Sequence, residues 1–267
     1  MHPSIPRLRT LIALIALLAA GAGFSLLRPD PPVPELHMSG RTMGTTYNVK
    51  YRPTQNAPAL KAMQTEVDAL LAEINHTMST YDPESELSRF NRLRTTDWVP
   101  ASDSLRTVLK AALEIGAQSE GAFDITVGPL VNLWGFGPEF HPDRIPLERD
   151  IAAARTRSGL DKVTLRDTQP AIRKHRPDVF LDLSGIAKGY GVDRVAELMT
   201  AHAIDHYMVE IGGEIRVRGL KEHETPWRIA IEKPLPGERS VQTVLALSDI
   251  ALATSGNYRN FFEIDGR

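Results

Sequence analysis

The segment 181–193 combines a carboxylate, a glycine turn and a lysine where a helix is expected to begin. The apolar run 179–181 ends at Asp182, and glycine-rich residues then turn the chain into a predicted helix at 185–202. Backbone N–H groups at a helix N-terminus attract phosphate oxygens. Lys188 adds a positive charge that the helix dipole disfavours there, which points to an anionic partner. Asp182 suits a hydrogen bond to that ligand or an oxygen-ligated metal. The alternative is a capped helix with an exposed lysine.

Two further segments place aromatic side chains where a planar ligand could stack on them. Tyr81 directly follows a predicted helix and opens a loop. The alternative is that Tyr81 and Phe90 anchor that loop to the core. In the Gly-, Pro- and aromatic-rich stretch 121–138, Asp124 lies between two apolar residues. A carboxylate in that setting is either buried and hydrogen-bonded or aimed into a pocket, and a structural corner is the alternative.

Three other stretches carry glycines or hydroxyls that a ligand could approach. Residues 40–47 (Gly-Arg-Thr-Met-Gly-Thr-Thr-Tyr) make a poor strand, and glycine in a strand often allows the close approach of a ligand or another backbone. A bulge with solvent-facing hydroxyls is the alternative. Residues 210–214 predict a bulge, and 254–258 predict a turn whose hydroxyls could meet phosphate; each of these two, taken alone, favours a structural role.

Periodicity predicts the elements that must position these residues. We expect helices at 59–78, 103–119, 146–157 and 185–202, and a loop at 79–101. We expect strands at 36–51, 162–166, 178–183, 206–219, 227–233, 241–247 and 249–253. Mixed helices and strands followed by a run of strands indicate an α+β fold with a largely antiparallel sheet.

Composition excludes several classes of site. The chain has no cysteine, so disulfides, thiolate catalysis and lipidation of an N-terminal cysteine are excluded. The formal net charge is −2 with no basic stripe, and no nucleic-acid partner is expected. Neither a Walker A motif nor a dinucleotide fingerprint is present.

Both ends of the chain carry their own signals. Arg7 and Arg9 precede an apolar run at 11–27, which predicts that residues 1–28 are a signal peptide or an inner-membrane anchor, followed by a Pro-rich linker at 29–36. Either interpretation places the rest of the chain in the periplasm. At the other end, 261–267 read as a strand entering a turn, so we expect the chain to be a C-terminally truncated fragment.

Six stretches, in matching order, resemble the ApbE family of FAD:protein FMN transferases. They are Thr42–Tyr47, Met78–Tyr81, Phe123–Leu130 with Trp134–Gly137, Asp182–Tyr190, Val209–Glu214 and Thr254–Tyr258. The resemblance spans about residues 38–267 and implies a T-fold-like α+β domain at 37–267, with helices packed on a largely antiparallel sheet.

The resemblance also implies the site. FAD is expected to contact Met43, Tyr81, Ala122, Phe123, Asp124, Asp182 and Lys188, with Asp182 and Lys188 as the catalytic residues. Gly185 falls where the family offers a backbone carbonyl to Mg2+. The family continues with a stretch similar to H-I-I-D-P-x-T-G, and then with an Asp and a Thr that complete the Mg2+ site.

The activity implied is Mg2+-dependent transfer of FMN from FAD to a threonine, or sometimes serine, hydroxyl of a target flavoprotein, with release of AMP. The implied acceptors are subunits of membrane redox complexes of the Na+-translocating NADH:quinone reductase or Rnf type. The alternatives are a periplasmic FAD pyrophosphatase, a non-enzymatic flavin-binding protein, and a scaffold that binds no ligand.

Overall fold

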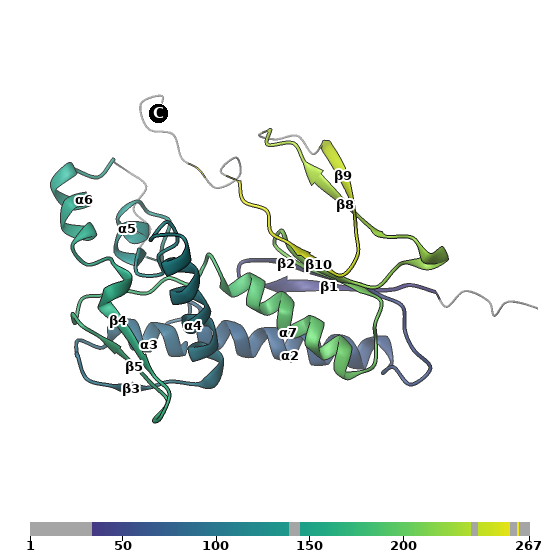
Figure 1. Cartoon of the computed structure of the whole chain (residues 1–267), viewed down its shortest axis with the longest axis horizontal. Helices are drawn as coiled ribbons and strands as arrows, with labels where there is room; N and C mark the ends of the chain where they lie inside the picture. The colour runs from purple at the N-terminus through teal and green to yellow at the C-terminus, as the bar shows by residue number, and fades with distance from the viewer. Residues whose placement is uncertain (1–33, 139–144, 236–239, 257–260, 262–267) are drawn as a thin grey trace, which may run out of the picture. The chain divides into compact units, whose positions relative to one another are not determined.

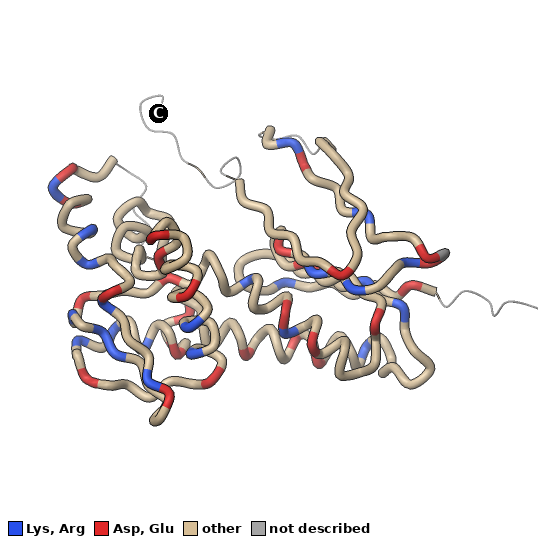
Figure 2. The backbone as a smooth tube through the Cα atoms, viewed as in Figure 1, with Lys and Arg blue, Asp and Glu red and all other residues tan. Residues whose placement is uncertain are grey.

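The computed structural model describes residues 34–138, 145–235, 240–256 and 261. The predicted signal or anchor at 1–28, most of the linker, and the predicted turn at the C-terminal end lie outside the described residues. None of the helices in the described ranges has the length and apolar character needed to cross a bilayer. Figure 2 shows basic and acidic residues interspersed along the described chain.

A five-stranded antiparallel sheet is the central element of the fold (Figure 1). Its strands, in spatial order, are β1 (Leu36–Thr42), β2 (Thr45–Tyr51), β6 (Tyr207–Ile211), β7 (Glu214–Arg218) and β10 (Ile250–Leu252). Every neighbouring pair in this sheet is antiparallel. The α+β class and the largely antiparallel sheet are therefore confirmed.

Two long helices, α2 (Leu60–Met78) and α7 (Ala187–Ala201), pack against each other and against this sheet (Figure 1). Apolar residues recur along α2 at spacings of three or four, and each is buried: Met63, Val67, Leu71, Ile74 and Met78. This spacing puts them on one helix face, which covers the core. The predicted helices at 59–78 and 185–202 are confirmed with shifts of one or two residues at their ends.

A second region of helices and a small sheet follows α2 in the chain (Figure 1). It contains α3 (Glu86–Arg92), β3 (Val99–Pro100), α4 (Asp103–Gln118), α5 (Gly128–Leu133), α6 (Glu148–Arg155), η1 (Leu160–Lys162), β4 (Val163–Arg166) and β5 (Ala171–Lys174). The three strands are antiparallel in the order β3-β5-β4. Ser102 caps α4 by accepting a hydrogen bond from the Leu105 N–H at 3.2 Å, which fixes where that predicted helix begins.

The chain after β7 forms η2 (Glu222–Glu224) and an antiparallel pair, β8 (Trp227–Glu232) with β9 (Val241–Leu247). A small cluster of buried apolar side chains joins this pair to β7: Ile215, Val217, Trp227 and Ile229. The larger core cluster contains side chains from β1, β2 and β6, from the helices α2, α3, α4 and α7, and from the segment that precedes α7. The predicted strands at 227–233, 241–247 and 249–253 are confirmed.

Two segments predicted as single strands are hairpins instead. Residues 36–51 turn back at Met43 (φ 48°) and Gly44 (φ 73°), and 206–219 turn back at Gly212 (φ 54°) and Gly213 (φ 101°). Two consecutive positive φ angles make the tight turn that matches the twist of paired strands. The bulge expected at 210–214 was therefore wrong, because both glycines form the turn itself.

Two further predictions about local structure were wrong, and one strand was missed. The segment 79–101 was expected to be a loop but contains α3, which begins where Ser85 caps the Ser88 N–H, and the short strand β3. Residues 178–183 form no strand, because the backbone N–H and carbonyl of Leu181 bond to the side chain of Asn91 instead of a neighbouring strand. The strand β5 was not predicted.

Candidate functional site

A cavity of about 1740 Å3 lies where the two hairpin turns meet the N-terminal end of α7. Its walls come from the β1–β2 turn, the end of α2 with the loop that follows, the corner at 184–188, the β6–β7 turn, β8 and residues 254–256. Sites for drug-sized ligands typically enclose roughly 300–1,000 Å3. This cavity is therefore large enough for a dinucleotide-sized ligand.

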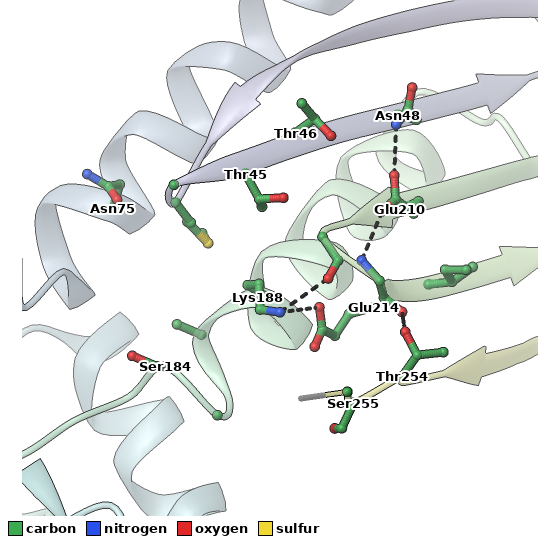
Figure 3. A pocket seen from close by; sticks show the side chains of 18 of the residues that line it. Thr45, Thr46, Asn48, Asn75, Ser184, Lys188, Glu210, Glu214, Thr254 and Ser255 are labelled. Atoms are coloured by element: carbon green, nitrogen blue, oxygen red, sulfur yellow. Dashed lines mark hydrogen bonds and ion pairs between the residues drawn. The ribbon is translucent and has the colours of Figure 1, made fainter. Parts of the chain in front are cut away.

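Lys188 extends from the first turn of α7 into this cavity, where it meets the β6–β7 turn (Figure 3). The Gly212 N–H donates to the Thr46 carbonyl at 3.1 Å, and Lys188 Nζ donates to the Gly212 carbonyl at 3.3 Å. A Cβ atom on Gly212 would lie 2.7 Å from Thr45 Cγ2, and the φ of 54° is itself unfavourable for other residues. Glycine is required here so that the two turns and the lysine can pack together.

Lys188 is paired with a carboxylate in the cavity wall. Its Nζ lies 2.8 Å from Glu214 Oε2, and both side chains are partly exposed. A partly exposed ion pair contributes little to stability, typically about 0–1 kcal/mol. An incoming phosphate group would compete with Glu214 for the ammonium, and the buried Oε2 of Glu214 would then lose this partner.

Glu210, in the strand β6 that leads into the same turn, holds this turn in place (Figure 3). One carboxylate oxygen accepts from Asn48 Nδ2 at 2.8 Å and the other from the Gly213 N–H at 2.9 Å. Thr254 Oγ1 donates to the Gly213 carbonyl at 3.1 Å. These side chains line the cavity. The segments around Glu210 and Thr254, which the sequence alone favoured as structural, thus both reach the site.

Tyr81 lies in the wall of the cavity and is 63% exposed. Its Oη donates to the Phe136 carbonyl at 2.8 Å. Burial of the hydroxyl raises the pKa of Tyr81, and the negative charge of Asp182 raises this pKa further. Phe90, by contrast, is buried at 3% exposure. The loop-anchoring alternative is therefore right for Phe90 and wrong for Tyr81.

Asp182 is buried directly behind the corner that precedes α7. Its Oδ1 accepts from the Ser184 N–H at 2.7 Å, and its own N–H donates to the Ile125 carbonyl at 2.8 Å. The N–H groups of Ile186 and Ala187 both donate to the Leu183 carbonyl. These two groups at the start of α7 are therefore already bonded, and a phosphate there would depend more on Lys188 than the sequence implied.

Four further predicted residues are Gly185 and the three consecutive residues Ala122, Phe123 and Asp124. Gly185 lines the cavity, and a Cβ on it would lie 3.1 Å from Phe123 Cε2, so the Phe123 ring packs against it from behind. Asp124 Oδ1 accepts from both the N–H and the hydroxyl of Thr126, at 2.7 and 2.6 Å. Ala122 is exposed, outside the cavity.

Of the eight predicted site residues, Met43, Tyr81, Gly185 and Lys188 therefore line the cavity, whereas Ala122, Phe123, Asp124 and Asp182 do not. Sequence reasoning did not select Asn48, Asn75 or Ser184 as site residues, although all three line it. Asn48 carries a sequence signal only in hindsight, as a polar residue inside an alternating strand.

A metal would find few protein ligands at this site. Within the described ranges, no three His, Cys, Asp or Glu side chains gather closely enough to hold a metal ion. Mg2+ usually takes one or two carboxylates and completes its shell with water and substrate phosphates. The Gly185 backbone in the cavity wall offers a carbonyl oxygen, and Asp182 lies buried directly behind it, so the described residues fit an Mg2+ ion held mainly by its substrate.

The fold and the cavity together define an α+β protein with a large ligand site, which has a lysine at one wall and an exposed tyrosine at another. The model of the ApbE family matches residues 43–267 of this sequence. The chain therefore belongs to the ApbE family.

Individual relatives agree with this assignment. The FAD:protein FMN transferase of Vibrio cholerae is 48% identical over 256 residues, which cover 96% of this chain and 74% of the relative. The protein with the same name from Haemophilus influenzae is 43% identical over 257 residues, covering 94% and 74%.

Solved structures show the same fold. The flavin transferase ApbE from Vibrio cholerae superposes with a TM-score of 0.80 at 48% identity, covering 87% of this chain and 75% of that structure. The apbe protein from Thermotoga maritima gives a TM-score of 0.79 at 28% identity, covering 88% and 74%. The ApbE-like architecture expected from the sequence is confirmed.

Proposed function

We propose that this protein transfers the FMN part of FAD to a hydroxyl group of a partner protein, with Mg2+ bound at the diphosphate. The observation that carries the proposal is the cavity, which brings Lys188 and Tyr81 to one space of dinucleotide size. Relatives that cover most of the chain are named FAD:protein FMN transferases. The relatives' names indicate FAD as the substrate, and the cavity contains the side chains that would bind it.

Each end of the cavity suits one part of FAD. Tyr81 presents an exposed ring on which the isoalloxazine can stack. Lys188 supplies a positive charge for the diphosphate once the phosphate oxygens displace Glu214 from its ammonium. Asp182 holds the Ser184 N–H and thereby the shape of the corner beside the phosphates.

The reaction forms one phosphoester bond and breaks one phosphoanhydride bond. The acceptor oxygen attacks the FMN phosphorus, the bond from this phosphorus to the oxygen bridging to AMP breaks, and the hydroxyl proton is lost to solvent. AMP leaves with both electrons of the broken bond. Bound Mg2+ would supply charge neutralisation at the phosphates, and Lys188 and the rigid turn at Gly212 would hold the phosphates in line for attack.

The remaining parts of the proposal concern partner and place. We infer from the family resemblance that threonine is the preferred acceptor residue and that the acceptors are subunits of membrane redox complexes of the NADH:quinone reductase or Rnf type. The basic and apolar N-terminal pattern supports an extracytoplasmic protein, periplasmic or held at the inner membrane by its N-terminus.

The test is to follow FAD in the presence of Mg2+ and a purified quinone-reductase acceptor subunit. We expect flavin fluorescence on the acceptor in a denaturing gel, with one AMP released per flavin transferred. Lys188→Met should lower the rate of flavin transfer at least about a hundredfold, because it removes a positive charge that stabilises the transition state. Lys188→Arg keeps the charge and should retain part of this rate. Lys110→Met, on the exposed face of α4, is the matched control.

Two outcomes would contradict the proposal in different ways. Release of free FMN and AMP with an unlabelled acceptor would identify water as the acceptor and the protein as a pyrophosphatase. FAD binding without turnover in the presence of Mg2+ would identify a flavin-binding protein.

A further inference from the structure

The short helix α3 contacts two segments of the site. One carries Asp182, which is buried behind the cavity, and the other carries Tyr81, which lines the cavity. No residue of α3 lines the cavity, so this helix has no direct part in the proposed chemistry. Three of its polar side chains are nevertheless buried: Ser88 at 6%, Asn91 at 5% and, at the residue before the helix, Ser85 at 0% exposure. Buried polar groups at these levels are retained for the hydrogen bonds they make.

The N-terminal end of α3 holds the loop that carries Tyr81. The Ser79 carbonyl accepts hydrogen bonds from the hydroxyls of both Ser85 and Ser88, the latter at 2.9 Å. Ser79 Oγ in turn accepts from the N–H groups of Tyr81 and Asp82 at 3.1 and 3.0 Å. The backbone at Tyr81 is thus connected to α3 through one residue.

The C-terminal end of α3 holds the segment that carries Asp182. Asn91 Nδ2 donates to the Leu181 carbonyl and Asn91 Oδ1 accepts from the Leu181 N–H, each at 2.8 Å. The asparagine side chain thereby replaces the neighbouring strand that this extended segment lacks. Both backbone groups belong to the residue directly before Asp182, so Asn91 holds the backbone next to that carboxylate.

Lys174 fixes the end of the helix itself. Its buried Nζ donates to the carbonyls of Phe90, Asn91 and Leu93 at 3.2, 3.3 and 2.6 Å. A cation at a helix C-terminus interacts favourably with the exposed carbonyls and the helix dipole. Since one of these carbonyls belongs to Asn91, the lysine also fixes the backbone from which the Leu181 contacts are made.

We propose that α3 is the positioning element of the ligand site, with Ser88 acting on FAD through Tyr81 and Asn91 acting on FAD through Asp182. This inference rests on the proposed function, since it assumes that FAD occupies the cavity. The two arms are separate: Ser88 makes no contact with the Leu181 backbone, and Asn91 makes none with Ser79, among the hydrogen bonds of the described residues.

The test is a set of double-mutant cycles on FAD affinity, measured by flavin fluorescence titration without turnover. Asn91→Ala should weaken FAD binding about tenfold in the wild-type background but less than about twofold in Asp182→Ala, because its contribution passes through that residue. Combined with Tyr81→Ala, the effect of Asn91→Ala should remain about tenfold. Ser88→Ala should show the reverse pattern, losing its effect in Tyr81→Ala and keeping it in Asp182→Ala.

Leu109→Ala is the control for a general loss of stability, because Leu109 is fully buried in α4 and outside the cavity. Leu109→Ala should lower the free energy of unfolding, measured in urea, about as much as Asn91→Ala does. It should leave FAD affinity unchanged. Effects of Asn91→Ala that are equal in all backgrounds, or absent, would overturn the inference. If Asn91→Ala does not fold, the Ser88 cycle decides alone. Failure of the wild-type protein to bind FAD would instead contradict the proposed function.

Discussion

Tyr81 presents its ring to the cavity while its hydroxyl is held by the Phe136 carbonyl. Tyr81→Leu should weaken FAD binding about tenfold or more, because stacking of a planar ring on an aromatic side chain contributes roughly 1–3 kcal/mol. Tyr81→Phe keeps the ring and should change the dissociation constant by less than about threefold. Quenching of flavin fluorescence on titration measures both variants.

Ile115→Ala serves as the control for Tyr81, since Ile115 is also an exposed apolar side chain but lies on α4, away from the cavity. It should leave FAD affinity unchanged. Equal affinities of Tyr81→Leu and wild type would place the flavin ring elsewhere in the cavity.

The sequence could identify Lys188 and Tyr81 but not the side chains that hold them. A lysine in the first turn of a helix and a tyrosine opening a loop are each unusual in their local setting. Asn48 and Glu210 meet only because β2 and β6 pair in a register that puts them opposite each other. Register across two strands far apart in the chain depends on the whole sheet, so no local pattern contains that contact.

At the scale of elements, the β1–β2 turn combines a backbone requirement with a ligand-facing side chain. Met43 adopts φ 48°, a left-handed conformation that asparagine tolerates better than methionine. Met43→Asn should change the free energy of unfolding by less than about 1 kcal/mol, because relief at the turn offsets lost packing. It should still weaken FAD binding, because the side chain lines the cavity.

Glu120→Asn provides the matched control for Met43. Glu120 also has a positive φ, of 53°, but it is exposed after α4 and outside the cavity. Its replacement should stabilise the protein slightly in urea unfolding and leave FAD affinity unchanged. If Met43→Asn kept full affinity, the side chain of Met43 would have no part in binding.

Helices were predicted better than the segments around them for a physical reason. The helices α2 and α4 carry their own periodic apolar faces, so local sequence determines them. The segment 178–183 has the composition of a strand, yet its pairing groups are taken by Asn91. A side chain that substitutes for a strand leaves no periodic signal, and strands as short as β3 leave almost none.

At the scale of the whole molecule, buried titratable groups link stability to pH. The pKa of Lys174 is lowered from its ordinary 10.5 to about 8, chiefly by burial and also by the nearby charge of Arg94, while Asp178 opposes the change. Burial also raises the pKa of Tyr47 to about 12, and so does the hydrogen bond that its hydroxyl donates to Asp68 at 2.6 Å. The two shifts act in successive pH ranges.

Between pH 8 and 10.5 the unfolded chain holds a proton on Lys174 that the folded protein releases. The free energy of unfolding should therefore rise with pH in this range, by at most about 3 kcal/mol. Between pH 10 and 12 the folded protein keeps the Tyr47 proton that the unfolded chain loses, so stability should fall. The opposite signs place a maximum near the overlap of the two ranges.

Urea unfolding followed by far-UV circular dichroism from pH 7 to 11 measures this profile, and two variants separate its limbs. Lys174→Met should flatten the rise, because no proton is then released on folding, whatever the variant's stability at pH 7. Tyr47→Phe should flatten only the fall in stability above pH 10, because it removes the titrating hydroxyl. The aromatic ring stays in place beneath Gly40, where a Cβ would lie 2.5 Å from Tyr47 Cε1. A rising limb that survives in Lys174→Met would mean that another group carries it, and that the ammonium holding the end of α3 stays charged throughout.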